Sequence, residues 1–209
     1  DVKLNGATGN YNAFEAAYPD GDWIKFTQGY VRLMNHGRKT KFRANLITTQ
    51  IEPHDSYIEL FNDIAHMNDI LIGFAQDIWR YISDDWFRQK PVEGEIGSST
   101  MPQKINPINF ENAEGNLGLS NVYLRHFSEK LAKSRLQRDL SDSTVMRNIG
   151  VAFAHSLISY EELVLGLEKV TLNEKKIYRE LRAHPEVVTE GIQTILRREG
   201  YSDAYEKTK

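Results

Sequence analysis

The sequence of 209 residues contains no cysteine. This absence excludes a disulfide framework, a thiolate zinc site and a cysteine nucleophile together, and it suits a reducing compartment. The sequence also lacks an apolar run long enough to span a membrane, and its N-terminus lacks the charged-then-apolar pattern of a signal peptide. We therefore expect a cytoplasmic protein that has no membrane partner.

An excess of positive charge is missing as well, because 26 basic residues stand against 29 acidic ones and the formal net charge is -3. This balance predicts no electrostatic attraction to nucleic acid or to an anionic membrane. This balance is still compatible with a small anionic ligand that is bound by a local group of cations. The composition, with 40% hydrophobic and 26% charged residues, fits one or two compact domains with a sizeable core.

Sheet signals are scarce, since no convincing alternation of apolar and polar residues is bounded by turns. Helical periodicity dominates instead. Apolar residues recur at steps of three and four from Ile58 to Trp86, from Pro107 to about Leu131, and from Ser141 or Ser143 to Val170. Shorter helices are expected at about 174–183 and 185–198, and residues 1–22 are expected to be mostly irregular around a short helical piece.

The first long segment carries the strongest helical signal. Its heptad spacing is interrupted only at Asn68, and Ser120 fills a similar gap in the next segment. Helices of this length, about 40–50 Å, have two apolar faces and are hard to cover within one chain. We expect an all-α long-helix bundle with shorter C-terminal helices, assembled as a homo-oligomer. The heptad residues are Ile58, Phe61, Ala65, Ile72, Ala75, Trp79, Ile82 and Trp86.

The connection between the first two long segments, residues 92–106, has the composition of a functional loop. A connection of this length in a helical bundle is often functional, and Gly94 and Gly97 permit unusual backbone conformations. Three adjacent hydroxyls, a lysine and the amides of the following helix start would form an anion site. A plain polar loop is the alternative, because a serine hydroxyl is a weak base unless its surroundings activate it. The side chains concerned are Ser98, Ser99, Thr100 and Lys104.

A second group of polar residues occurs in "SRLQRDLSDSTVMRN", residues 134–148. Ser143 and Arg147 are four apart and would share one helix face, an arrangement that suits phosphate or carboxylate. Ordinary capping by Ser141 or Asp142, with surface arginines paired to Asp139, explains the same residues without a ligand.

The string "TTQIEPHD", residues 48–55, precedes the first long helix. Gln50 could recognise a polar ring edge and His54 could titrate near neutrality, although a helix entry with proline and aspartate explains the string too. Glu111 and Glu114 lie one turn apart, but the six histidines offer no ligand spacing with them, so we predict no metal and no other cofactor. A glutamate that positions a histidine is the functional interpretation, and a solvated helix surface the alternative.

Several strings resemble one known group of enzymes. The loop "GSSTMPQKINP" resembles the signature of the fumarase/aspartase superfamily, GSSxMPxKxN followed by a glutamate. Within that superfamily the adenylosuccinate lyase family is similar in "NGATGNYNAFEAAYP", "TTQIEPHD", "FENAEGNLGLSN" and "RDLSDSTVMRN". The resemblance implies a homotetrameric lyase of purine biosynthesis. It would release fumarate by β-elimination from adenylosuccinate, giving AMP, and from succinylaminoimidazole carboxamide ribotide.

The resemblance also implies a role for individual residues. Ser98 would be the catalytic base, Lys104 and Asn106 would stabilise the charge that develops on the substrate carboxylate, and Glu111 would orient a catalytic histidine. The implied substrate-binding positions are Gln50, Ser99, Thr100, Met101, Lys104, Ile105, Asn106, Asn112, Arg138, Ser143, Thr144, Val145, Met146 and Arg147.

The resemblance further implies the central and C-terminal portions of such an enzyme. Residues 1–171 would form the central helical-bundle domain with the catalytic loop at 93–106, and residues 172–209 would begin a small C-terminal helical domain. The N-terminal domain and the general-acid histidine would be absent, so we expect the chain alone to be inactive. Gln103 replaces a histidine common in adenylosuccinate lyases, and "MPQK" is also similar to argininosuccinate lyase. The alternatives are the activity of an argininosuccinate lyase or of a fumarase-type lyase, or no catalysis at all in a helical oligomerisation module.

Overall fold

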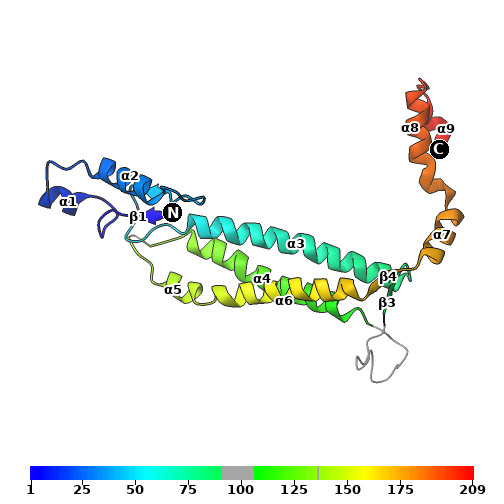
Figure 1. Cartoon of the computed structure of the whole chain (residues 1–209), viewed down its shortest axis with the longest axis horizontal. Helices are drawn as coiled ribbons and strands as arrows, with labels where there is room; N and C mark the ends of the chain where they lie inside the picture. Colours follow the sequence, from blue (N-terminus) through cyan, green and yellow to red (C-terminus); the bar gives the residue numbers. More distant parts are fainter. Residues whose placement is uncertain (91–105, 136) are drawn as a thin grey trace. The chain divides into compact units, whose positions relative to one another are not determined.

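The computed structural model describes residues 1–90, 106–135 and 137–209, and these residues are predominantly helical (Figure 1). This confirms the predicted all-α class. The described helices are α1 (Asn12–Ala17), α2 (Trp23–Met34), α3 (Asp55–Ser83), α4 (Ile108–Leu131), α5 (Ser141–Met146), α6 (Ile149–Glu168), α7 (Glu174–Ala183), the 3-10 helix η1 (Pro185–Val188), α8 (Thr189–Arg198) and α9 (Ala204–Thr208). The strands are β1 (Val2–Lys3), β2 (Ala44–Asn45), β3 (Phe87–Gln89) and β4 (Val170–Leu172).

The chain forms two compact units, each built from segments that are distant in the sequence. The first unit comprises Asp1–Gly73 and Ala113–Tyr160, and the second comprises Phe74–Asn112 and Glu161–Lys209. Helices α3, α4 and α6 therefore contribute residues to both units. The predicted domain boundary near residue 171 divides the sequence at one point, whereas each of these units combines distant segments. The units do not test that boundary, which stays a prediction.

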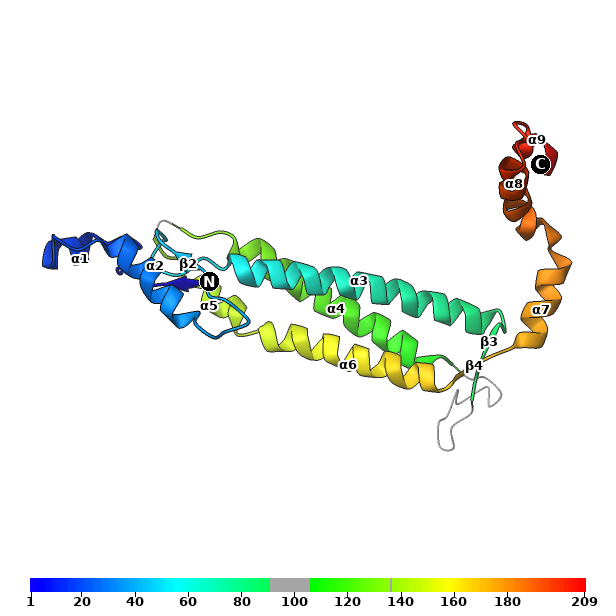
Figure 2. The ribbon, with the colours of Figure 1, turned by 45° about the horizontal axis from the view of Figure 1, so that its top comes forward.

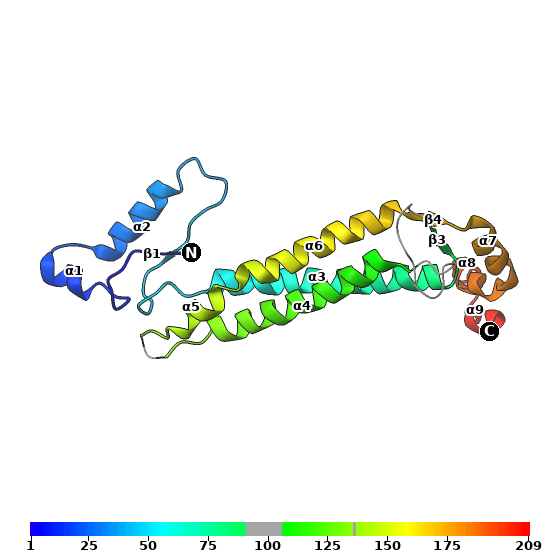
Figure 3. The same cartoon turned by 90° about the horizontal axis from the view of Figure 1, so that it is seen from below.

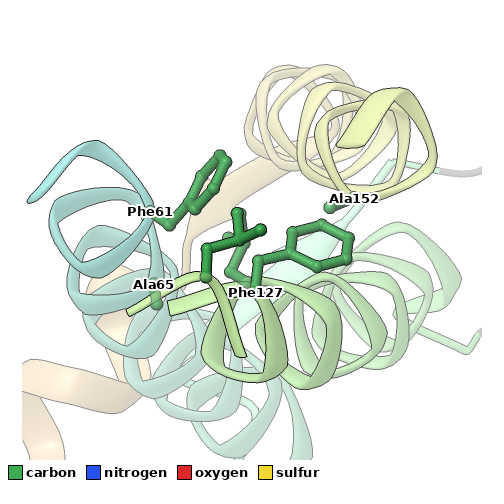
Figure 4. Packing of buried hydrophobic residues seen from close by; sticks show 6 residues of the cluster. Phe61, Ala65, Phe127 and Ala152 are labelled. Carbon is green, nitrogen blue, oxygen red and sulfur yellow. The ribbon is translucent and has the colours of Figure 1, made fainter. Parts of the chain in front are cut away.

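The core of the first unit is formed where α3, α4 and α6 lie side by side (Figure 1, Figure 2 and Figure 3). Phe61 on α3 packs edge-to-face on Phe127 of α4, with ring centroids 5.6 Å apart (Figure 4). Such rings dominate core energetics because each removes a large apolar area from water. The buried cluster lies at positions that the helical periodicity predicts, and its members are Phe61, Ala65, Leu124, Phe127, Leu131 and Ala152.

A buried polar cluster interrupts this apolar packing at the two predicted gaps, Asn68 and Ser120. The Asn68 amide nitrogen donates to Asn121 Oδ1 and Ser156 Oγ, each at 3.0 Å, and lies 3.3 Å from Ser120 Oγ. The Tyr160 hydroxyl donates to Asn68 Oδ1 at 2.6 Å. Because each polar group has partners, the cluster avoids the penalty of buried unsatisfied groups. We call Asn68, Ser120, Asn121, Ser156 and Tyr160 the Asn68 cluster.

The third predicted helix is wrong as a single element, because it divides at Asn148 into α5 and α6. The Asn148 amide donates to Val145 O at 3.0 Å and its side chain to Thr144 O at 3.1 Å, while its carbonyl accepts from Val151 N at 3.0 Å. One residue therefore ends a helix and begins the next, which is a favoured role for asparagine.

Helix α2 was not predicted at all. Asp22 caps it by accepting from Lys25 N at 2.9 Å, and Thr27 is buried beneath the Tyr11 hydroxyl, which donates to it at 2.9 Å. Only Thr27 and Val31 of this helix are buried, although its apolar residues also recur at steps of three and four.

The second unit contains the antiparallel pair β3 and β4, in which Arg88 is the partner of Thr171. Asn173 ties the following turn to this pair, since its amide donates to Trp86 O at 2.8 Å and its side chain to Asp85 O at 2.8 Å. Two strands of three residues agree with the expectation of little sheet. A membrane span would need a longer stretch of apolar helix than the described residues provide.

Candidate functional site

The signature loop falls largely outside the described residues. Its predicted residues Ser98, Ser99, Thr100, Met101, Lys104 and Ile105 all belong to the range 91–105. Asn106 is the first described residue after this range. It is half-buried and directly precedes the buried Pro107. The loop chemistry therefore stays a prediction.

Glu111 lies in the first turn of α4, within the second unit. Its backbone amide donates to Pro107 O at 3.2 Å, and its carboxylate Oε1 accepts from the indole Nε1 of Trp79 at 3.0 Å. The bond joins α3 to α4 and fixes the direction of the carboxylate. Asn112 follows it, and both residues are exposed.

A turn near the N-terminus holds the segment that contains Gln50. Gly9, with a φ of 83°, packs so closely on this segment that a Cβ atom there would lie 1.9 Å from Thr48 O. Asn5 donates to Gly9 O, Leu46 O and Thr48 Oγ1 at 3.0 to 3.1 Å. The segment "NGATGN" thus packs on "TTQIEPHD" and holds it in place. Position 9 requires glycine, because only glycine adopts this backbone without strain and leaves room for Thr48.

The Gln50 segment and the arginine-rich segment meet within the first unit. Gln50 N donates to Gln137 O at 3.2 Å, although the two residues are far apart in the sequence. Gln50 and the neighbouring Arg138 are both exposed, so a ligand can reach both. A neutral amide and a guanidinium on two segments that meet suit a ligand that carries a polar ring and an anionic group.

Asp142 lies at the centre of this meeting point and is 8% exposed. Its Oδ1 accepts from Ser143 N at 2.5 Å and lies 3.8 Å from Arg138 Nη2. Its Oδ2 lies 3.6 Å from the Nε2 of His54. A buried carboxylate needs such partners, because charge without compensation is costly away from water.

The alternative of ordinary helix capping is partly right for this segment, but the residue that accepts the hydrogen bonds differs from the predicted ones. Asp139, not Ser141 or Asp142, accepts from Ser141 N at 3.0 Å and from Ser141 Oγ at 2.8 Å, and it also binds Lys130 at 3.1 Å. These hydrogen bonds, led by the Ser141 amide, hold the pKa of Asp139 well below its usual range. Arg135 pairs with Asp139 at 3.7 Å, as that alternative expects, whereas Arg138 faces Asp142.

Helix α5 places the predicted run from Ser143 to Arg147 in different surroundings. The Ser143 hydroxyl donates to Leu140 O at 2.8 Å, and Val145 and Met146 pack against the core cluster. Thr144 and Arg147 are exposed. A ligand at this segment would therefore meet the side chains of Thr144 and Arg147, together with backbone groups of the others.

One cavity, of about 530 Å³, lies in the second unit apart from these residues. None of the predicted site residues that the structure describes lines it. The lining residues are Tyr81, Trp86, Phe87, Ile177, Glu180, Leu181, His184 and Val187. Among the described residues, no group of three or more histidine, aspartate or glutamate side chains is arranged to hold a metal ion.

Sequence reasoning missed two contributors to these sites. Trp79 was taken only as a heptad core residue, and Asp142 only as a possible cap. No spacing rule links either residue to its partner, because 32 residues separate Trp79 from Glu111 and Asp142 meets His54 only in the folded chain.

Two family profiles match the chain. The profile described as "Lyase" matches residues 2–123, and the profile described as "Adenylosuccinate lyase C-terminal" matches residues 134–209. The first alone covers more than half of the chain.

Relatives named adenylosuccinate lyase are similar over the whole chain. The identity is 50% over 208 residues for Legionella pneumophila (strain Corby), 51% over 207 residues for Escherichia coli (strain K12), and 51% over 207 residues for Dictyostelium discoideum. These matches cover 99 to 100% of this chain but only 44% of each relative. The chain thus spans less than half the length of these relatives.

A solved structure confirms the fold. The class II fumarase from Schistosoma mansoni matches with a TM-score of 0.58 and 18% identity, over 88% of this chain and 40% of that one. At this identity the match shows the fold alone.

Proposed function

The chain belongs to the lyase family, and we propose that the protein which carries it releases fumarate from adenylosuccinate to give AMP. The observation that carries this proposal is about 50% identity, across the whole chain, to proteins named adenylosuccinate lyase. Succinylaminoimidazole carboxamide ribotide is the proposed second substrate, and purine biosynthesis in the cytoplasm the setting of the reaction. Since the chain covers 44% of those relatives, the activity is proposed for the longer protein.

The proposed reaction is a β-elimination. Ser98 removes a proton from the carbon next to a succinyl carboxylate, which puts a second negative charge on that group. Lys104 and Asn106 stabilise this charge by hydrogen bonds arranged in advance. The C–N bond then breaks, its electron pair goes to nitrogen, and a general acid protonates the leaving group. Glu111 orients the histidine that serves as this acid, and that histidine lies in no segment of the present chain.

Substrate binding is proposed for the two segments that meet in the first unit. Gln50 would contact the purine ring edge, and Arg138 and Arg147 the phosphate or a carboxylate. The Gln50 to Gln137 backbone bond supports this assignment, since it holds the two segments together. Asn112 would contact the substrate from α4.

Self-association is part of the proposal, with the homotetramer as the expected form. Large apolar side chains stay exposed along α3, α4 and α6, and such surface is usually covered by a partner. The domain division at residue 171 belongs to the same proposal. It rests on the resemblance of residues 1–171 to the central region of these enzymes.

Ser98→Ala in the longer protein tests the chemistry. Turnover, followed by the ultraviolet absorbance of fumarate, should fall by at least about a hundredfold, because a general base typically contributes that much. Thermal stability should stay the same. Unchanged turnover would show that Ser98 is not the base.

Two controls separate the alternatives. Fumarate release from argininosuccinate or malate, and not from adenylosuccinate, would replace the substrate assignment, and no release from any of them would favour a non-catalytic helical module. The chain of 209 residues alone should release little fumarate. A rate like that of the longer protein would contradict the proposal that the proton donor lies elsewhere.

A further inference from the structure

The imidazole of His54 is a buried polar group that the proposed mechanism does not use. Its side chain is 12% exposed, and neither ring nitrogen has a hydrogen-bond partner among the described residues. Buried polar groups in folded proteins are nearly always paired, and an unpaired one points to a function or to a partner supplied in another state. His54 therefore needs an explanation that packing does not provide.

The position of the ring is well defined. The His54 carbonyl accepts from Ile58 N at 3.0 Å, which places the residue at the start of α3. The ring lies nearly parallel to that of Tyr57, with centroids 5.8 Å apart and planes inclined by 13°. This contact directs Nε2 toward Asp142 Oδ2, at 3.6 Å. The distance is beyond a hydrogen bond but needs only a small approach to become one.

Asp142 is shared between His54 and Arg138, which face different oxygens of the same carboxylate. Arg138 Nη2 lies 3.8 Å from Oδ1, a distance at which it also makes no hydrogen bond. The guanidinium is partly exposed, whereas the imidazole is mostly buried. Arg138 can therefore turn toward a ligand, while the buried ring of His54 lies beside Asp142.

We propose that His54 is a positioning residue that replaces Arg138 at Asp142 when the ligand's anionic group binds Arg138. The inference rests on the proposed function, in which Arg138 contacts a phosphate or carboxylate. A buried carboxylate that loses its cation without replacement is strongly destabilised. The Nε2–H of His54 supplies that replacement, so Arg138 is released to the ligand at a smaller free-energy cost. His54 thus favours ligand binding without touching the ligand.

His54→Phe in the longer protein tests this exchange. Phenylalanine keeps a ring against Tyr57 but cannot donate to Asp142, so Arg138 stays with the carboxylate or leaves it unpaired. KM for adenylosuccinate and Kd for AMP should rise about tenfold, and kcat should change less than about threefold, because the lost interaction acts on binding. His54→Gln, whose amide can donate to Asp142, should restore KM to within about threefold. His36→Phe replaces an exposed histidine and is the matched control.

A double-mutant cycle with Arg138→Met distinguishes positioning from a general structural effect. If His54 acts through Arg138, His54→Phe should raise Kd for AMP no further in the Arg138→Met background. An undiminished effect there would overturn the proposal, and so would an unchanged KM in His54→Phe or a glutamine variant as impaired as the phenylalanine variant. Circular dichroism verifies that each variant is folded.

Failure of the proposed function gives a different pattern. If the unaltered protein releases no fumarate but binds AMP, and His54→Phe weakens that binding only when Arg138 is present, the lyase proposal fails and the role of His54 stands. If the unaltered protein binds no AMP, the exchange proposed here is overturned too.

Discussion

Tryptophan and glutamate side chains pair twice in the second unit. Trp79 Nε1 donates to Glu111 Oε1 at 3.0 Å, and Trp86 Nε1 donates to Glu180 Oε2 at 2.5 Å. The indole bond is the main reason why the pKa of Glu180 lies below its usual value, with Lys176 adding to the effect. At Glu111, the glutamate that is proposed to orient a histidine, the indole bond fixes the direction of the carboxylate.

The Trp79 pair gives a prediction about turnover. Trp79→Phe keeps the aromatic ring but removes the donor, so Glu111 loses the bond that fixes its direction. In the longer protein, kcat should fall about tenfold, the equivalent of about 1.4 kcal/mol, while KM changes less than about twofold. Initial rates of fumarate release across a range of adenylosuccinate concentrations measure both constants.

Trp86→Phe is the matched control, because it removes the same kind of bond from Glu180. Its kcat should equal that of the unaltered protein. An equal loss of kcat in both variants would show that the effect comes from the stability of the second unit. No loss in Trp79→Phe would show that Glu111 is oriented by other groups.

Among the elements, the long helices α3, α4 and α6 share the Asn68 cluster. Ser120 Oγ adds two bonds to it, donating to Ala152 O at 2.9 Å and lying 2.7 Å from Ser156 Oγ. A buried, fully bonded polar layer fixes which residues of neighbouring helices face one another, since any shift leaves several groups unpaired. The two gaps in the apolar periodicity therefore specify the register of the helices.

Asn68→Leu should destabilise the chain by about 2–4 kcal/mol, because leucine has a similar shape but leaves several buried partners unsatisfied. Urea unfolding followed by circular dichroism gives the free energy of unfolding. Ser128→Ala is the control, since the hydroxyl of the buried Ser128 donates to Leu124 O of its own helix, at 3.1 Å. It should change stability by less than about 0.5 kcal/mol. A more stable Asn68→Leu variant would mean that the cluster lowers stability.

The sequence was sufficient to predict the long segments in which apolar residues recur over many turns. Phe61 and Leu124 lie in the core because the step of three and four puts them on one face of their helices. Helix α2 was missed although Trp23, Phe26 and Tyr30 recur at the same steps of three and four. The break at Asn148 was missed because the periodicity continues past it.

The candidate site was predictable in its parts and not in its assembly. Residue type indicated Gln50 as a possible ligand contact, and the family resemblance implied Arg138. Their meeting depends on the bond from Gln50 N to Gln137 O, which no local pattern predicts. For the same reason the proximity of His54 to Asp142 became visible only in the structure.

For the molecule as a whole, the exposed apolar residues of the long helices require an explanation. Single exposed apolar residues are ordinary on a protein surface, but here they recur along three helices. Val122 on α4 is 69% exposed, and Leu119 lies one turn before it on the same helix. The large apolar side chains exposed on α3, α4 and α6 are Tyr57, Leu60, Met67, Ile70, Trp79, Ile108, Leu119, Val122, Val151, Leu157, Ile158, Val164, Leu165 and Leu167.

We expect these surfaces to be covered by further copies of the same chain, as the homo-oligomer proposal requires. Light scattering should give the mass of several chains for the longer protein, and Val122→Glu should lower it, because a buried carboxylate without a partner is costly at an apolar interface. Ile195→Glu makes the same change at an exposed apolar position of α8 and should leave the mass unchanged. Helix content by circular dichroism should stay the same in both variants. A monodisperse monomer before any substitution would contradict the proposal, and an undiminished mass in Val122→Glu would place the interface elsewhere.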